Sequence, residues 1–378
     1  MLGKTNTTAL REGAVITEIE DYRWVRMPSG INGDFARAVY KNGLLAAVTA
    51  DGKVAHTADG EVWEVSDPEF AGCRFRDIEW DGNRFILVGS CESGDTTERT
   101  GLILTTADFV SYEKKELAND GKPEEYLAVL VRNGRYILAT SKPSVVSTDF
   151  EQTTYKNMAK NYNITIGVSA VKNENAMLVY VHERGESGVA SHTHSLYMVD
   201  ENSVRSLKTY DYNPSYAMLT LLECKGALYT MGRITELNYN LDKITEAGEI
   251  MTVTTGQNFM FVDGVYFDGC QIFINSHDML VAKKGESLAE KTTEDLKEIV
   301  PESTLRCVTK AFGQLYLFGN QGLVLRSSVE AGNEGPVTVQ ALSAKRALAE
   351  AKAYADGKYT ELETRIAELE KRLSGTTA

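Results

Sequence analysis

One β-hairpin pattern recurs along most of this chain and constrains its fold more than any other feature. In CRFRDIEWDGNRFILVGS, residues 73–90, an apolar run ends at Trp80, a turn follows at Asp81-Gly82-Asn83, and a second apolar run begins at Phe85. Glycine tolerates the positive φ that tight hairpin turns require, so Asp-Gly between apolar runs predicts two antiparallel strands. A single hairpin would indicate little, but this one is repeated.

The hairpin can be read seven times, at intervals of about 39 to 52 residues. The turns lie at Asn42-Gly43, Asp81-Gly82, Asn133-Gly134, Asn173 to Asn175, Lys225-Gly226, Asp268-Gly269 and Phe312-Gly313. A period of this length, built from short strands alone, is typical of a β-propeller. The repeats therefore predict an all-β fold, a seven-bladed β-propeller spanning residues 14–330 after an N-terminal tail, residues 1–13.

A third strand and a turn containing aspartate follow the first three hairpins. The turn aspartates are Asp59, Asp108 and Asp149, and they lead to the aromatic residues Trp63, Tyr112 and Tyr155. These segments resemble degenerate Asp-box turns, in which the carboxylate accepts hydrogen bonds from nearby backbone amides. With a fourth strand after each turn, one repeat corresponds to one four-stranded blade.

The seventh repeat is one strand short, because Gly322 to Arg326 leads into AGNEGPV with no aromatic fourth strand. The segment DYRWVRMP, residues 21–28, precedes the first complete repeat and has no hairpin of its own. We expect it to close the ring as the outer strand of the last blade, with Trp24 in the position that Trp63 occupies in the first. The alternative is six blades and a separate small sheet.

Beyond a linker at residues 331–340, the pattern changes to heptads over residues 341–373. The apolar heptad positions include Leu348, Tyr359, Leu362, Ile366, Leu369 and Leu373. A stripe this narrow favours a C-terminal α-helical coiled coil that makes the protein a homo-oligomer. The heptad residues do not choose cleanly between two and three strands, and we favour a trimer. A helix packed back on the propeller is the alternative.

Charge and composition exclude several classes of protein. The net charge of −13 argues against nucleic acid and anionic membrane surfaces as partners. No apolar run approaches the roughly 20 residues of a membrane span, and the N-terminal residues lack the apolar core of a signal peptide. The five cysteines contain no CxxC pair, which indicates buried thiols in a protein made in a reducing cytoplasm.

No catalytic constellation is recognisable, so we predict no catalytic residue, no cofactor and no metal. The Asp-box turns resemble those of sialidase-type glycosidases, but Tyr22-Arg23-Trp24-Val25 departs from the F/Y-R-I-P segment of that family. His192-Thr193-His194 would place two imidazoles on one face of a strand, yet the pair is read here as part of a loop insertion without a third metal ligand.

The ligand-binding face is predicted from loop irregularity. Turns between the first and second strands, and between the third and fourth, are uniformly tight, whereas the other connections vary in length and carry tyrosines. Variable loops on a rigid scaffold concentrate function, and aromatic faces suit sugars. The candidate ligand-binding residues are Tyr162, His192, His194, Tyr210 and Tyr212. Packing between blades is the alternative role for such tyrosines.

Taken together, the hairpins, the Asp-box-like turns and the AKAYADGKYTELETRIAELE helix resemble virion proteins of phages that infect Gram-positive bacteria. The resemblance implies a virion location and a tail-fibre or tail-tip receptor-binding component, non-enzymatic, that recognises host cell-surface glycan. A structural capsid (head-fibre) or baseplate decoration protein that contacts other virion proteins is the alternative, and a sialidase-like glycosidase is a further one.

Overall fold

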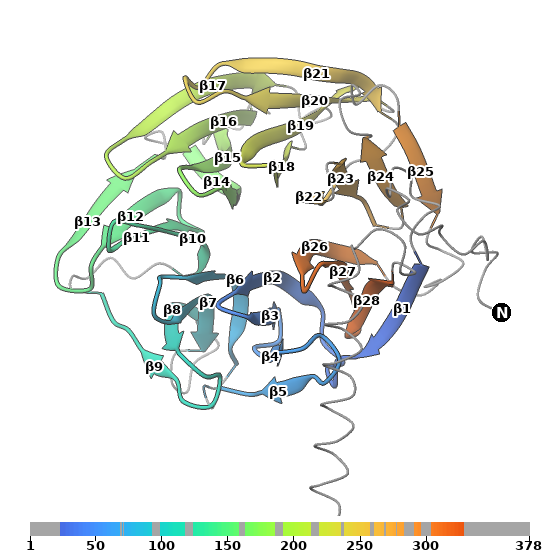
Figure 1. Ribbon diagram of the computed structural model, residues 1–378. Helices are drawn as coiled ribbons and strands as arrows, with labels where there is room; N and C mark the ends of the chain where they lie inside the picture. Colours follow the sequence, from blue (N-terminus) through green and yellow to red (C-terminus); the bar gives the residue numbers. More distant parts are fainter. Residues whose placement is uncertain are drawn as a thin grey trace, which may run out of the picture. The chain divides into compact units, whose positions relative to one another are not determined.

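The computed structural model describes residues 23–68, 70, 72–92, 99–117, 124–158, 163–185, 192–212, 219–235, 238–257, 261–267, 270–276, 278–282, 291–295 and 304–328. These residues contain β-strands and no helix, and their strands form seven antiparallel four-stranded sheets. The sheets stand around a common centre (Figure 1). The all-β propeller prediction is confirmed.

We number the sheets in chain order from the first complete repeat. Sheet one comprises β2 (Phe35–Lys41), β3 (Leu44–Thr49), β4 (Val54–Thr57) and β5 (Glu64–Ser66). Sheet two comprises β6 (Arg74–Trp80), β7 (Phe85–Glu92), β8 (Arg99–Thr106) and β9 (Glu113–Lys114). Sheet three comprises β10 (Tyr126–Arg132), β11 (Arg135–Thr140), β12 (Ser144–Thr148) and β13 (Thr153–Asn157). Sheet four comprises β14 (Asn163–Lys172), β15 (Met177–Gly185), β16 (His192–Val199) and β17 (Val204–Tyr212).

The remaining three sheets complete the ring. Sheet five comprises β18 (Leu219–Cys224), β19 (Ala227–Thr235), β20 (Asn238–Ile244) and β21 (Ile250–Gln257). Sheet six comprises β22 (Asp263–Phe267), β23 (Cys270–Ile274), β24 (Asp278–Ala282) and β25 (Lys291–Asp295). Sheet seven comprises β26 (Leu305–Ala311), β27 (Gln314–Gly319), β28 (Leu323–Ser328) and β1 (Arg23–Pro28). The first strand of each sheet contacts the first strand of the next, and β26 contacts β2, so the ring is closed.

Closure depends on the N-terminal strand, as the sequence predicts. β1 pairs antiparallel with β28, and Trp24 lies opposite Ser327. The indole is 6% exposed, which agrees with a closing strand that buries its aromatic side chain. Because β1 and β28 come from opposite ends of the propeller, their pairing joins these two ends and leaves no open seam in sheet seven.

The tight turns have the backbone geometry that their sequences predict. Between first and second strands, four turns place two successive residues at positive φ, the signature of a type I′ hairpin. They are Asn42-Gly43, Asn133-Gly134, Lys225-Gly226 and Phe312-Gly313. Such turns match the twist of the strands that they join.

The Asp-box-like turns make the predicted hydrogen bonds. The Oδ1 atom of Asp59 accepts from the backbone N–H groups of Glu61 and Val62, at 2.8 and 2.9 Å. Asp108 and Asp149 repeat the arrangement in sheets two and three. In sheet four, Oδ1 of Asp200 accepts in the same way from the backbone N–H groups of Asn202 and Ser203 in its own turn.

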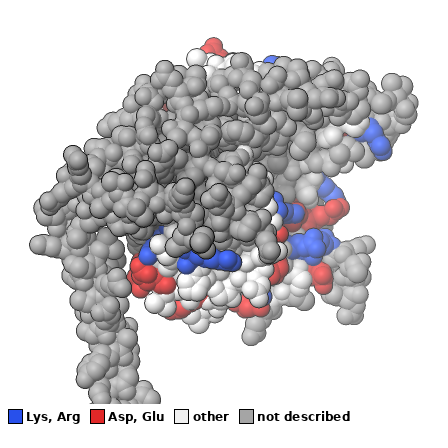
Figure 2. All heavy atoms as spheres, turned by 90° about the vertical axis from the view of Figure 1, so that its right-hand side faces the viewer, with Lys and Arg blue, Asp and Glu red and all other residues white. Residues whose placement is uncertain are grey.

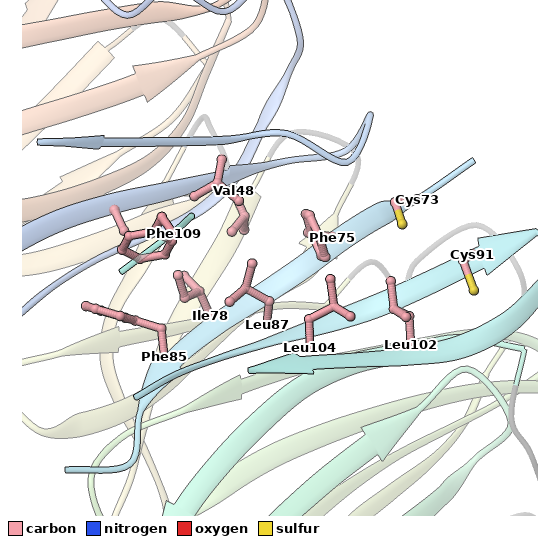
Figure 3. Close-up of a cluster of buried hydrophobic side chains, with 12 residues drawn as sticks. Val48, Cys73, Phe75, Ile78, Phe85, Leu87, Cys91, Leu102, Leu104 and Phe109 are labelled. Atoms are coloured by element: carbon pink, nitrogen blue, oxygen red, sulfur yellow. The ribbon is translucent and has the colours of Figure 1, made fainter. Parts of the chain in front are cut away.

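Apolar side chains fill the seams between neighbouring sheets. Between sheets one and two, Val48 belongs to one apolar cluster with side chains of the three inner strands of sheet two and with Phe109 (Figure 3). Phe109 has a φ of 57°, an uncommon value for a phenylalanine, and its ring lies 4.7 Å from that of Phe85. All five cysteines are buried free thiols, in agreement with the sequence.

Several predicted segments lie outside the described residues. These are the N-terminal tail at residues 1–13, the linker at 331–340, and the predicted coiled coil at 341–373 with its heptad residues. The described residues all belong to one of the two units into which the chain divides. No membrane-spanning helix was found in the described part of the chain.

Candidate binding site

A cavity of about 880 Å³ opens where the first strands of the sheets end, beside the type I′ turns. Its lining includes residues from the first strand of each of the seven sheets. A site built in this way is positioned by the whole ring, so its walls are as rigid as the fold itself. The cavity lies on the tight-turn side of the molecule, opposite to the face that loop irregularity favours.

Ion pairs connect four residues of the cavity lining, Arg37, Glu79, Lys172 and Asp263, with one another and with Asp77, and we call this group the floor. Arg37 in β2 pairs with Asp263 in β22 at 3.2 Å and lies 4.0 Å from Asp77 in β6. Lys172 at the end of β14 reaches the same Asp77 at 2.5 Å and Glu79 at 3.2 Å. The network therefore joins sheets one, two, four and six across the centre of the ring.

Each floor aspartate also connects its sheet to the next one. The Oδ2 atom of Asp77 accepts a hydrogen bond from the backbone N–H of Val129 in β10, at 2.9 Å. Asp263 accepts one from Val308 in β26, also at 2.9 Å. Because buried carboxylates require partners on most of their lone pairs, these bonds compensate for lost hydration and fix the carboxylates in place.

A β-bulge lies directly before Arg37 in β2 and before Asp77 in β6. The pairing register of the first and second strands shifts between Phe35 and Arg37, and between Phe75 and Asp77. Such bulges redirect the side chains that follow them. The phenylalanine before each bulge is buried, whereas the charged residue after it belongs to the network.

The network controls the charge of the groups that line the cavity. Asp263, and then Asp77, raise the pKa of the Arg37 guanidinium above its ordinary value although burial opposes this. Burial also works against ionisation of Glu79, yet Lys172 and the backbone N–H of Trp80 lower its pKa. In contrast, burial raises the pKa of Glu223 in β18, even though the N–H of Gly226 donates to its Oε1 at 2.7 Å.

Aromatic and basic side chains form the rim. The rings of Tyr40 and Phe312 meet edge to face, with centroids 4.7 Å apart. The Lys225 ammonium lies 4.4 Å from the centre of the Tyr266 ring. These rings are half-buried, as is Trp80, so each keeps part of its surface accessible. The rim therefore combines flat apolar faces with charged hydrogen-bonding groups, which is the combination that binds sugars.

A second cavity, of about 810 Å³, lies at the other ends of the first strands. Its lining includes Asp34, which precedes β2, and Phe35, the first residue of β2. It also includes Arg306, near the start of β26. Arg76 and Glu125 form an ion pair of 2.9 Å in its wall. Aromatic residues contribute less to this cavity than to the first, so we regard it as the weaker candidate.

The structure brings together four of the five predicted ligand-binding residues. His192 and His194 lie in β16, and in register with them in β17 lie Tyr212 and Tyr210. Tyr162 lies outside the described residues. The description of the histidines as part of a loop insertion is wrong, because β16 begins at His192. A polar segment forms a strand here because pairing with β15 and β17 satisfies its backbone.

The two histidines differ in exposure. His194 is 2% exposed, and its Nδ1 is hydrogen-bonded to the hydroxyl of Tyr180 at 2.5 Å. His192 is half-buried, and its Nδ1 is joined to Nε2 of His182 at 2.7 Å. Within the described residues, no group of three or more histidine, cysteine or acidic side chains is arranged to hold a metal ion.

Sequence reasoning missed the cavity and its floor. The sequence contains part of the signal for the floor, because a charged residue at an inward-facing strand position is unusual. Asp77 in RFRDIEW and Lys172 in SAVKN are examples. Their meeting depends on long-range closure of the ring, which the strand pattern does not specify.

Comparison with known proteins supports the fold. No protein-family model matches the chain, and neither does any curated protein. Among solved structures, YCF48 from Cyanidioschyzon merolae is similar with 13% identity and a TM-score of 0.55, over 80% of this chain and 98% of that one. An inactive virginiamycin B lyase from Staphylococcus aureus is similar with 10% identity and a TM-score of 0.57, over 81% and 99%. The WD40 β-propeller domain of Doa1 is similar with 14% identity and a TM-score of 0.51, over 83% of this chain and 99% of that one. At these identities the likeness shows the propeller fold alone.

Proposed function

We propose that this protein is a non-enzymatic recognition module, the receptor-binding component of a phage tail fibre or tail tip, and that its propeller binds host cell-surface glycan. The observation that carries the proposal is the cavity of about 880 Å³ that the first strands of all seven sheets line. Its rim offers partly exposed aromatic rings beside lysines, and its floor is held by paired charges. The virion location rests on the resemblance of the repeats and the C-terminal heptads to phage fibre proteins.

The chemistry of the cavity favours binding over turnover. Arg37, Lys172 and Asp77 are engaged with one another, so the floor provides fixed charges rather than a free base or nucleophile. Preorganised groups of this kind bind hydroxyl-rich ligands without reorganising. The similar structure of YCF48 bound to D1 peptide is consistent with a propeller of this fold acting as a binding scaffold.

A glycan with both apolar faces and polar substituents fits the rim best. A pyranose ring can stack on Trp80 or Tyr266, while Lys225 and Glu174 lie within the same lining to contact its hydroxyls. On the coloured part of the surface in Figure 2, basic and acidic residues are interspersed. Binding by one propeller should be weak, and oligomerisation through the heptads would raise avidity by a factor of about 10² or more.

The test compares the two faces of the propeller for adsorption to host cells. Trp80→Ala and Tyr266→Ala should reduce adsorption at least tenfold, while Lys142→Ala, near the second cavity, should leave it unchanged. A third set, with alanine at Tyr162, Tyr210 and Tyr212, tests the face that loop irregularity favours. All variants are first checked for an unchanged melting temperature.

The outcomes distinguish the hypotheses. Loss of adsorption in the third set alone would move the glycan site to the irregular loops. If no variant changes adsorption and the protein is found on the capsid, the decoration role is correct and receptor binding is wrong. Hydrolysis of glycan by the wild-type protein would exclude a non-enzymatic role.

A further inference from the structure

Four polar rings cluster on one face of sheet four, at a distance from the central cavity's lining. They are Tyr180 and His182 from β15, and His192 and His194 from β16. His182 lies directly opposite His194 in the strand pairing, and their rings stack with centroids 4.2 Å apart. The centroids of His182 and His192 are 5.0 Å apart, and those of His192 and His194 are 6.4 Å apart.

This face of sheet four is directed toward sheet five. Further along the same two strands, Leu178 and Leu196 pack in one apolar cluster with Leu228 in β19 and Ile244 in β20. Side chains alternate along a strand, so Tyr180 and His182 continue the face of Leu178, and His194 and His192 continue that of Leu196. The seam between sheets four and five is thus apolar at one end and rich in histidine at the other.

The opposite wall of the seam is polar at the same end. Following Leu228 along β19, Thr230 lies on the same face, and it pairs with Asp242 in β20. Asn240 precedes Asp242 by two residues and pairs with Gly232. The polar end of sheet four therefore faces a polar end of sheet five.

Several buried atoms of this seam lack a hydrogen-bond partner within the described chain. They are Nε2 of His194, Oγ1 of Thr230, Oδ1 of Asn240 and Oδ1 of Asp242. Buried polar groups normally have hydrogen-bond partners. A concentration of unpartnered groups therefore lowers the free energy by which packing of sheet four on sheet five stabilises the fold. The seam between sheets one and two contains one such atom, Nδ1 of His56, beside the apolar cluster of Figure 3.

We propose that the seam between sheets four and five is a protonation-sensitive joint, closed while His182 and His194 are neutral and loosened when acid charges them. The joint is separate from the glycan cavity, and the proposal does not depend on the function of that cavity. It concerns how the fold responds to pH.

The hydrogen bond between His182 and His192 provides the first reason. A bond between two imidazole nitrogens requires one of them to be unprotonated, so that it can accept. When both rings are protonated, two N–H groups face each other across 2.7 Å, and the bond becomes a repulsion. The stacked ring of His194, 4.2 Å from His182, adds a third charge to the same small volume.

The surroundings of the cluster favour its neutral form. Burial, and then His192, lower the pKa of His182. Burial, then His182 and His192, lower the pKa of His194 to about 4. An unfolded histidine titrates near 6.5. Since the open state binds protons more readily than the closed one, stability of the seam is complete above about pH 6.5 and falls as the pH drops toward 4.

The other charged groups near the cluster do not cancel this effect. Arg184, opposite His192 in the pairing, and Lys208, opposite Leu196, are cations on the neighbouring strands. Asp242 on sheet five is one carboxylate against three imidazoles, and Glu183 follows His182 on the other face of β15. Of the remaining elements, β14 contributes Ser169 opposite Tyr180, while Tyr210 and Tyr212 of β17 pair with His194 and His192.

Hydrogen–deuterium exchange on the full-length chain tests the proposal. Exchange is measured from pH 7.5 to 4.5 and corrected for the intrinsic rate. Peptides of β15, β16, β19 and β20 report the seam, and those of β3 and β7 serve as the internal reference. For each proton taken up on opening, the opening constant of the seam should rise about tenfold for each unit by which the pH is lowered. The opening constants of the reference peptides should change less.

Two substitutions assign the effect to the cluster. His192→Gln, at a half-buried position, removes the imidazole pair with His182 and the ring that disfavours charge on His182 and His194, so the pH slope at the seam should decrease. His56→Gln, in sheet one, is the matched control and should leave that slope unchanged. If His192→Gln does not fold, the test is whether the wild-type pH dependence of exchange is steeper in the seam peptides than in the reference peptides.

Three results would overturn the proposal. One is protection of the seam that is independent of pH down to 4.5. Another is an equal loss of protection in the reference peptides, which would indicate global acid unfolding. The third is an unchanged slope in folded His192→Gln.

Discussion

The hydroxyl of Ser29 donates a hydrogen bond to the backbone carbonyl of Gly322, at 2.7 Å, across 293 residues of sequence. The N–H of Gly322 in turn donates to the carbonyl of Gly33 at 2.8 Å. These bonds continue the pairing of β1 with β28 into the adjoining turns. Closure of the ring is therefore not limited to one strand, and the turn before β28 forms part of it.

Gly322→Ala should weaken this closure strongly. Gly322 has a φ of +70°, and a Cβ atom there would come within 1.7 Å of the Ile31 carbonyl oxygen. Strain and overpacking together should lower the free energy of unfolding by about 2–5 kcal/mol. Gly43→Ala is the control, because Gly43 has a similar φ of +76° and open space around it. Equal losses in urea titrations of the two variants would mean that the contact with Ile31 is unimportant.

Trp24→Ala tests the closing strand itself. The indole is 6% exposed, so its removal should lower the free energy of unfolding by about 3–5 kcal/mol. Val25→Ala is the matched control on the same strand, because Val25 is 39% exposed and should contribute little. Thermal unfolding followed by circular dichroism measures both. Equal melting temperatures for Trp24→Ala and the wild type would contradict the role of Trp24.

Asp59→Ala removes the carboxylate of the first Asp-box-like turn. Its Oδ1 accepts hydrogen bonds from two backbone N–H groups, at Glu61 and Val62, so the loss should be about 1–2 kcal/mol. Asp51→Ala should have a smaller effect, since Asp51 makes only a long ion pair of 3.9 Å with Lys53 among the interactions described for it. Adsorption to cells should be unaffected in both. A stable Asp59→Ala variant that fails to adsorb would assign this turn a binding role.

The floor of the cavity can be tested through Lys172. Its side chain is 8% exposed and pairs with Asp77, which is 5% exposed. Lys172→Met should lower the free energy of unfolding by about 3–5 kcal/mol, because the Asp77 carboxylate would stay buried with one cation fewer. Lys142→Met breaks an exposed pair with Glu124 and should cost less than about 1 kcal/mol. The double variant Lys172→Met/Asp77→Asn should recover part of the loss; a purely additive result would show that the two side chains do not interact.

The parts of the fold that the sequence predicts are those that short segments specify. An Asn-Gly turn between apolar runs encodes a hairpin, and Asp59 encodes its own turn, since the partners lie within three residues. Ring closure was predictable for another reason. The last repeat lacks a strand and the N-terminal segment supplies one, so counting strands was sufficient.

The candidate site could not be predicted in the same way. Arg37 and Asp263 are separated by 226 residues and meet only after the ring has closed. The histidine cluster could be predicted in part, because His192 and His194 are two residues apart and would lie on one face of a strand. His182 was missed as their neighbour, because the polar run HERGESGVASHTH has no apolar alternation and reads as a loop. Strand pairing with β15 and β17 overrides that local preference.

The heptads of residues 341–373 give the last prediction, which concerns the assembly. Their apolar stripe, with Leu362, Ile366 and Leu369, is too narrow to bury fully within one chain and is typical of a coiled coil. The full-length chain should sediment as an oligomer at micromolar concentration, and a chain ending at Gly335 should sediment as a folded monomer. Ile366→Asp should dissociate the oligomer as truncation does, because a charge in the heptad seam is left without a partner. Thr364→Asp, outside the apolar stripe, adds the same negative charge and serves as the control for a change of charge alone. A full-length monomer, or an oligomer that persists after truncation, would refute the assignment of these residues to oligomerisation.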